Sequence, residues 1–292
     1  MAASDQPLVI DFHTHVFPPE VVAEREKFFF GEPAFRLLYE NPRKSPLATT
    51  EDLIAALDRS GIQGAVTFGF PWKRPEWIRR GNDYVLEALA RYPDRLRGFA
   101  CVNPELPEAR TEAERCLEAG MQGIGELALY AAPSGKNWLE CFGPLAQLAA
   151  ERGVPLLLHT NEPVGHPYPG KERLPAWDLY ALIQSFPETR FILAHWGGGL
   201  WWYALLKREV REVLRHVYVD TAASPFLYRP EIYRYALEIF GVEKILYGSD
   251  YPLLTLDRYV KELKEARVGK ADQEAILGGN ARKLLDWPRT RP

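Results

Sequence analysis

Short hydrophobic runs recur along the chain, and a segment with helical periodicity follows most of them. The runs are rich in Val, Ile, Leu and Phe and are typical of strands that are buried on both faces. They span residues 8–15, 64–70, 96–102, 123–129, 155–159, 191–195, 217–221 and 244–250. The predicted helices span residues 49–61, 82–91, 107–119, 138–152, 175–186, 200–215, 230–240, 256–266 and 271–285.

This alternation continues through all 292 residues without a linker or a change in composition. It predicts an α/β fold, a single (β/α)₈ TIM barrel domain over residues 1–292. An open doubly wound sheet is the alternative, but it requires a glycine-rich turn after the first strand, and Pro18 and Pro19 stand close to that position instead. Residues 16–48 are rich in aromatic residues and proline and lack clear periodicity, which indicates a functional loop or a lid.

The composition limits the classes of molecule that the chain is expected to bind. With 47% hydrophobic and 26% charged residues, it is typical of a globular protein, and its net charge of −3 argues against nucleic-acid binding. No apolar run approaches the ~20 residues of a membrane span, and the N-terminus lacks a signal-peptide pattern, so we expect a cytoplasmic protein that binds a small molecule. The three cysteines contain no CxxC pair, which argues against both a disulfide framework and a thiolate metal site.

Two histidines close the first predicted strand. Side chains alternate between the two faces of a strand, so His13 and His15 point to the same side. Such a pair can hold one metal ion. Taken alone, however, it is equally compatible with two histidines packed in the core.

Four of the six histidines lie at the C-terminal ends of predicted strands, where barrel enzymes build their active sites. Asp250 holds the equivalent position on the eighth predicted strand, and Glu126 lies close to that position on the fourth. Imidazoles with carboxylates suit Zn²⁺ best, with Mn²⁺, Fe²⁺ and Co²⁺ as alternatives. The predicted metal ligands are His13, His15, Glu126, His159, His195 and Asp250.

Other interpretations stay open for four of these residues. His195 is either a ligand or a hydrogen-bonding partner of the substrate, and His159 is alternatively a core histidine. Glu126 is alternatively the partner of an arginine inside the barrel, and Asp250 the cap of a turn.

Several motifs in order along the chain resemble the amidohydrolase superfamily. Within it, the chain is similar to the amidohydrolase-related branch that contains aminocarboxymuconate semialdehyde decarboxylase and γ-resorcylate decarboxylase. The motifs lie at residues 10–15, 159, 194–199 and 247–252, with further similarity at 92–99 and 276–281.

The resemblance implies roles for the predicted ligands. His13, His15 and His159 would bind the metal, and Asp250 would both touch it and shuttle a proton. His195 would polarise substrate or water at a one-metal site and bind the second ion at a two-metal site. Glu126 stands where some members carry a carboxylated lysine, which leaves open whether one or two ions are bound.

The chemistry of such a site favours hydrolysis. A metal ion lowers the pKa of bound water toward ~7, so Asp250 can accept a proton while His195 stabilises an oxyanion. We therefore predict a metal-dependent hydrolase that cleaves an amide, ester or lactone bond of a small molecule. The alternatives are a nonoxidative decarboxylase of an unsaturated or aromatic acid, in which Asp250 or His195 protonates carbon, and a catalytically inactive barrel with a binding role. The sequence leaves the substrate and the oligomeric state open, with a homo-oligomer as one option.

Overall fold

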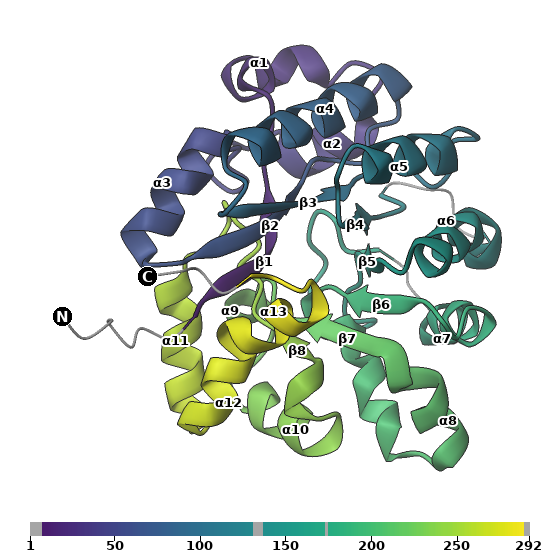
Figure 1. Ribbon diagram of the computed structural model, residues 1–292, viewed down its shortest axis with the longest axis vertical. Helices are drawn as coiled ribbons and strands as arrows, with labels where there is room; N and C mark the ends of the chain where they lie inside the picture. Colours follow the sequence, from purple (N-terminus) through teal and green to yellow (C-terminus); the bar gives the residue numbers. More distant parts are fainter. Residues whose placement is uncertain (1–7, 131–136, 173–174, 289–292) are drawn as a thin grey trace.

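Eight parallel strands form one sheet in the order of the sequence (Figure 1). The computed structural model describes residues 8–130, 137–172 and 175–288. The strands are β1 (Ile10–His15), β2 (Gly64–Phe68), β3 (Leu96–Ala100), β4 (Gly123–Leu127), β5 (Pro155–Leu158), β6 (Arg190–Leu193), β7 (Val217–Asp220) and β8 (Ile245–Leu246). Each lies within a predicted run, except that β6 begins one residue before its run, at Arg190.

The last strand returns to the first. The backbone N–H of Phe12 donates to Tyr247 O at 2.7 Å, and the N–H of Asp250 donates to His13 O at 3.0 Å. These bonds link the segment that follows β8 to β1, so the sheet forms a nearly closed barrel. The predicted TIM barrel is confirmed, because parallel strands in sequential order with helices on the outside define that architecture.

Helices surround the strands (Figure 1). Most outer positions are filled by α3 (Thr50–Ser60), α4 (Pro75–Arg91), α5 (Ala109–Glu118), α6 (Trp138–Arg152), α7 (Ala176–Ser185), α10 (Glu231–Ile239) and α11 (Leu256–Glu265). The start of α3 shows how the sequence sets a boundary: Thr49 and Asp52 form a reciprocal capping box, and Gly61 ends the helix in a left-handed conformation.

The barrel interior is packed with apolar side chains. The rings of Phe12 and Phe99 meet edge to face at 5.7 Å, although β2 separates their strands in the sheet, so both rings point into the barrel. Trp287, after the final helix α13 (Asn280–Leu284), packs with the same buried group. This packing leaves the C-terminal ends of the strands as the place for polar side chains.

Three stretches differ from the prediction. The helix expected over residues 82–91 is α4, which begins earlier, at Pro75. The helix expected over residues 200–215 is a 3₁₀ segment, η2 (His195–Leu205), followed by the short helix α8 (Arg208–Val213). Residues 196–199 adopt positive φ angles and Leu206 is extended, so no continuous helix can form there. In the stretch expected to lack regular structure lie the short helices α1 (Pro19–Ala23) and α2 (Pro33–Tyr39) and the 3₁₀ turn η1 (Arg25–Phe28).

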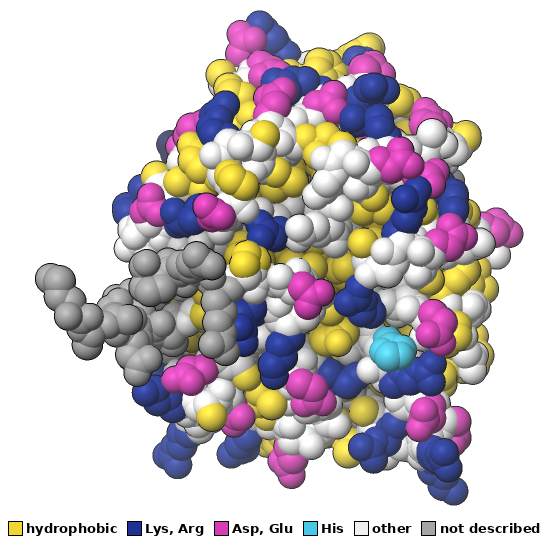
Figure 2. Space-filling model, viewed as in Figure 1, with side chains coloured by type: hydrophobic (Ala, Val, Ile, Leu, Met, Phe, Trp, Pro, Cys, Tyr) yellow, Lys and Arg dark blue, Asp and Glu magenta, His cyan; other side chains and the backbone are white. Residues whose placement is uncertain are grey.

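The remaining short elements are η3 (Leu214–His216), α9 (Ser224–Leu227), η4 (Val242–Lys244), α12 (Lys270–Glu274) and η5 (Ala275–Gly279). On the face shown in Figure 2, Lys and Arg side chains are interspersed with Asp and Glu, so the described atoms there form no extended basic surface. Among the described residues, no helix has the length and apolarity to cross a membrane.

Candidate metal centre

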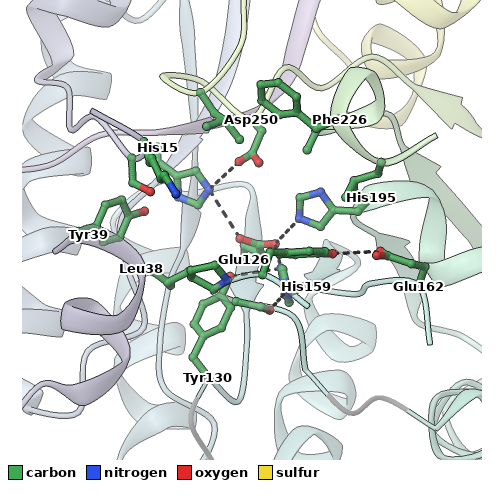
Figure 3. A pocket seen from close by; sticks show the side chains of 18 of the residues that line it. His15, Leu38, Tyr39, Glu126, Tyr130, His159, Glu162, His195, Phe226 and Asp250 are labelled. Atoms are coloured by element: carbon green, nitrogen blue, oxygen red, sulfur yellow. Dashed lines mark hydrogen bonds and ion pairs between the residues drawn. The ribbon is translucent and has the colours of Figure 1, made fainter. Parts of the chain in front are cut away.

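The predicted ligands meet at the C-terminal ends of the strands. His13 and His15 come from β1, Glu126 from β4, His159 from the residue after β5, and His195 from the start of η2. Asp250 follows β8. Figure 3 shows His15, Glu126, His159, His195 and Asp250 around one end of a cavity.

Each of the four histidines uses one ring nitrogen to hold its ring in place. An oxygen that can only accept a hydrogen bond fixes that nitrogen as the donor. The pairs are His13 Nδ1 with Asp220 Oδ2 at 2.8 Å, His15 Nδ1 with Gly69 O at 3.3 Å, His159 Nε2 with Gly170 O at 3.1 Å and His195 Nδ1 with Ala222 O at 2.9 Å. The other nitrogen of each ring therefore points into the cluster as a potential ligand atom.

The inward atoms are close enough to share a cation. Nε2 of His13 lies 3.2 Å from Nε2 of His15, and both atoms lie 3.5–3.6 Å from Glu126 Oε2 and Asp250 Oδ1. Two ligands bound to one ion at about 2.0–2.2 Å are separated by roughly 3.0–3.5 Å at common bond angles. Facing lone pairs repel each other unless a proton or a metal ion lies between them. The donor set and its spacing therefore fit a divalent metal.

Among the described residues, two overlapping groups have ligand atoms that all lie within 4.8 Å of one another. His13, His15 and Asp250 form one group, and His13, Glu126 and His195 form the other. His159 belongs to neither group but turns Nδ1 toward Glu126 Oε1 at 3.0 Å. The structure thus brings the six predicted residues together, with Glu126 between the two sides.

Without a metal ion, protons supply the positive charge. Burial lowers the pKa of His195, but the carboxylates of Glu126 and Asp250 raise it to about 9. Burial likewise lowers the pKa of His13, and Asp220 and Glu126 raise it well above its ordinary value. Burial raises the pKa of Asp250, but His15, His13 and His195 lower it to about 2. The carboxylates are therefore ionised, and the metal must displace protons from the imidazoles.

Two of these residues adopt unusual backbone conformations. His195 has φ 54° and Asp250 has φ 63°, in the left-handed region that non-glycine residues rarely adopt. Such a conformation costs on the order of 1–3 kcal/mol, and it persists only where the surroundings enforce it. Here it turns both side chains into the cluster, which is typical of a functional site.

A cavity of about 790 Å³ opens above the cluster. Aromatic and aliphatic residues form much of its wall, including Tyr39, Phe70, Tyr130 and Phe226. The rings of Phe70 and Tyr130 are nearly parallel, with centroids 6.0 Å apart, and the Tyr130 hydroxyl lies 3.2 Å from His159 Nδ1.

Residues 162–171 form a loop on one side of the cavity. Glu162 and Tyr168 line the cavity, and Lys171 Nζ donates to Glu162 Oε1 at 2.8 Å and to the carbonyl of Val164. The same loop supplies the Gly170 carbonyl that holds His159. One segment therefore shapes the cavity wall and orients a ligand.

Sequence reasoning missed Asp220 and the Gly170 carbonyl. Asp220 ends β7, so its place at a strand end was a signal equal to that of Asp250. The Gly170 carbonyl carries no signal, because any residue has one. Among the aromatic side chains that follow the strands, Tyr130 lines the cavity, whereas Trp72 and Trp196 are buried in the core.

The amidohydrolase family model matches residues 10–287 of the chain. The chain is 25% identical over 281 residues to γ-resorcylate decarboxylase of Polaromonas sp., covering 82% of this chain and 84% of the relative. It is 22% identical to 2-amino-3-carboxymuconate-6-semialdehyde decarboxylase of Dictyostelium discoideum, covering 95% of this chain and 91% of the relative.

Solved structures share the fold. A 5-carboxyvanillate decarboxylase of Novosphingobium aromaticivorans with bound manganese superposes with a TM-score of 0.75 at 18% identity, covering 97% of this chain and 98% of the other. A dihydroxybenzoic acid decarboxylase of Polaromonas sp., with bound manganese and 2-nitroresorcinol, gives 0.69 at 21% identity, covering 98% of each chain.

These relatives correct the predicted reaction. They are decarboxylases, so the prediction of a hydrolase is wrong, and the alternative stated beside it has the better support. The ligand set could not distinguish the two reactions, because both need a cation and a proton carrier. A divalent metal is supported, but the preference for zinc is not confirmed, since these two neighbouring structures hold manganese.

Proposed function

Because the chain belongs to the amidohydrolase family, we propose that it is a divalent-metal-dependent decarboxylase of a small aromatic or unsaturated acid. The observation that carries the proposal is the arrangement of four imidazoles at one end of a cavity with many aromatic residues in its wall. Each ring is anchored by one nitrogen and presents the other to Glu126, and Asp250 lies beside the free nitrogens of His13 and His15. The names of the relatives support decarboxylation as the reaction.

The proposed ligands are His13, His15 and Asp250, with Glu126, His159 and His195 available on the other side of the cluster. A bound divalent ion supplies the positive charge that attracts a substrate carboxylate and a neighbouring oxygen. We assign no preference for zinc over manganese.

The cavity wall orients the substrate. Phe70 and Tyr130 offer flat ring surfaces, which suit a planar conjugated acid and limit the access of water. With the carboxylate end at the cluster, the carbon that bears it lies on the side where His195 and Asp250 point into the site.

The reaction needs one proton on carbon. His195, with a pKa raised to about 9, can deliver this proton directly, whereas the ionised Asp250 can deliver it only after accepting a proton from a substrate hydroxyl group or from water. Protonation draws an electron pair from the conjugated system of the substrate. The bond between that carbon and the carboxyl carbon then breaks, its electron pair restores the conjugated system, and CO₂ leaves. Both side chains are held by their left-handed backbone, so the donor is positioned before the substrate arrives.

Purified protein loaded with Mn²⁺ or Zn²⁺ tests the proposal. The panel contains γ-resorcylate, 5-carboxyvanillate, further hydroxybenzoates and unsaturated dicarboxylic acids, and the readout is CO₂ release together with loss of substrate absorbance. In D₂O, the product should carry one deuterium where the carboxylate stood. Chelated protein serves as the control. Metal-replete protein that releases CO₂ from none of these acids would contradict the proposal.

A further inference from the structure

Asp220 connects two parts of the cluster that come from different strands. It ends β7 and is fully buried. Its Oδ2 accepts from His13 Nδ1 at 2.8 Å, and its Oδ1 accepts from the backbone N–H groups of His195 and Ala222, both at 3.0 Å. A carboxylate with both oxygens engaged in this way sets one side chain and one backbone segment at once.

We infer that Asp220 is a positioning residue that fixes the tautomer of His13 and the backbone of His195 together. The inference rests on the metal centre of the proposed function. Asp220 itself contacts no substrate: it acts through a ligand and through a proton carrier.

The effect on His13 follows from the chemistry of imidazole. Asp220 can only accept a hydrogen bond, so Nδ1 of His13 carries the proton, and Nε2 keeps its lone pair for a metal. A carboxylate in this position also makes the ring a stronger ligand and fixes its orientation.

The effect on His195 follows from its backbone. Its backbone N–H donates to Asp220 Oδ1 at the end of β7, and its left-handed φ of 54° sets the direction in which the side chain leaves this anchored N–H. The neighbouring N–H of Ala222 donates to the same oxygen, and Ala222 O accepts from His195 Nδ1. The position of Asp220 therefore determines both the backbone and the ring of His195.

Gly248 encloses the pair from the side of β8. A Cβ at residue 248 would lie 2.7 Å from the Cβ of His13 and 3.5 Å from the Cβ of Asp220, so only glycine leaves room for both side chains. The Thr221 hydroxyl donates to Gly248 O and accepts from Gly248 N–H, both at 3.1 Å. These two bonds hold the segment after β8 against the end of β7. The contact between His13 and Asp220 is thus enforced by packing as well as by hydrogen bonding.

The test replaces one acceptor without changing the shape. In Asp220→Asn, the amide offers one acceptor oxygen and one donor nitrogen, so it must give up either His13 Nδ1 or the two backbone N–H groups. We expect the dissociation constant for Mn²⁺ or Co²⁺, measured by chelator competition without substrate, to rise about 10–100-fold. The absorption spectrum of the Co²⁺-loaded variant should also differ from that of the wild type.

Glu32→Gln is the matched control. Glu32 is a buried carboxylate that also accepts from two backbone N–H groups, those of Lys73 and Arg74, away from the histidines. This variant should lose stability but keep the metal affinity and the Co²⁺ spectrum of the wild type. A drop in metal affinity shared by both variants would show a general effect of removing a buried charge, and would overturn the inference.

A second measurement does not depend on a variant that folds. Side-chain ¹⁵N spectra of the wild-type, Zn²⁺-loaded protein should show His13 protonated at Nδ1 and bound to the metal through Nε2. An unprotonated Nδ1, or an Asp220→Asn variant with wild-type metal affinity and spectrum, would overturn the inference alone. Wild-type protein that binds no divalent ion would contradict the metal centre itself.

Discussion

Nδ1 of His159 lies 3.0 Å from Oε1 of Glu126, although the other nitrogen of that ring already donates to Gly170 O. Two acceptors at this distance repel each other unless a cation, or the Tyr130 hydroxyl next to them, relieves the contact. The same condition holds for the Nε2 atoms of His13 and His15. The resting site therefore needs added positive charge.

Metal binding should stabilise the fold. A ligand at 100 times its dissociation constant contributes about 2.7 kcal/mol, which raises the melting temperature of a chain of 292 residues by roughly 4–5 °C. Differential scanning fluorimetry with Mn²⁺, against chelated protein at matched ionic strength, measures this shift. An unchanged melting temperature would contradict the assigned site.

Metal affinity should fall as the pH falls. Burial lowers the pKa of both His195 and His13, but nearby carboxylates raise the pKa of His195 to about 9 and the pKa of His13 well above its ordinary value, so both rings favour an extra proton near neutral pH. Binding must release protons, and lower pH opposes that release. Calorimetry in two buffers with different ionisation enthalpies counts the protons. Equal heats in the two buffers would show that none is released.

Asp250 and Glu126 should respond differently to excess metal. Asp250→Asn keeps a ligand oxygen but cannot carry a proton, so the decarboxylation rate should fall about 10²–10⁴-fold even when the site is metal-saturated. Glu126→Gln should mainly lower metal occupancy, and added metal should restore much of the rate. Steady-state rates across a metal titration separate the two. Full rescue of Asp250→Asn by added metal would identify His195 as the proton carrier. A metal-replete but inactive Glu126→Gln variant would instead identify Glu126 on β4 as the proton carrier.

Tyr130→Phe should affect substrate more than metal. The change keeps the ring beside Phe70 and removes the hydroxyl next to His159. Burial and then Glu126 raise the pKa of Tyr130, so its hydroxyl keeps its proton. With a metal ion on His159 Nδ1, this hydroxyl would be free to donate a hydrogen bond to a substrate oxygen. We expect KM to rise up to about tenfold, the loss of one hydrogen bond, with metal affinity unchanged within a fewfold. A variant that loses metal but keeps KM would place the hydroxyl in ligand support instead.

Glu262→Gln should remove a pH-dependent loss of stability. The Glu262 side chain on α11 is buried, and one of its oxygens has no partner among the described residues. Burial raises its pKa from 4.5 to about 7, against smaller lowering effects of Ser224, Tyr233 and Arg258, while Glu265 adds to the rise. The folded state therefore holds a proton that the unfolded chain has already released between these values, and stability falls as the pH rises through this window.

The glutamine carries no charge, so the variant should be more stable than the wild type above pH 7, by on the order of 2 kcal/mol, and nearly equal to it below pH 5. Urea unfolding at pH 5 and pH 8 measures both. Glu265→Gln, an exposed change on the same helix, removes only a minor contribution to the raised pKa of Glu262 and should therefore keep most of the pH-dependent loss of stability. A constant difference between wild type and Glu262→Gln at both pH values would contradict the assignment.

The sequence predicted the position of the cluster because parallel barrel strands end on one face. His13, His159 and Asp250 could therefore be placed together although they lie far apart along the chain. It could not predict the path after His195, because three glycines allow positive φ angles but do not require them. The orientation of His159 depends on the backbone carbonyl of Gly170, and a backbone carbonyl cannot be predicted from residue type because every residue has one. The reaction itself depends on which bond of the substrate meets the cluster, and the ligands alone do not specify that bond.

The loop of residues 162–171 limits how this protein can change its substrate range, because Glu162 and Tyr168 face the cavity while the carbonyl of Gly170 holds His159. An exchange of the whole loop with that of a relative would reshape the cavity and release a ligand in the same step. Substitutions at Val164 and His166, which line the cavity but place no side chain on His159, avoid this conflict. Directed evolution for new acids should therefore accumulate changes at those two positions while keeping the length from Glu162 to Lys171 constant.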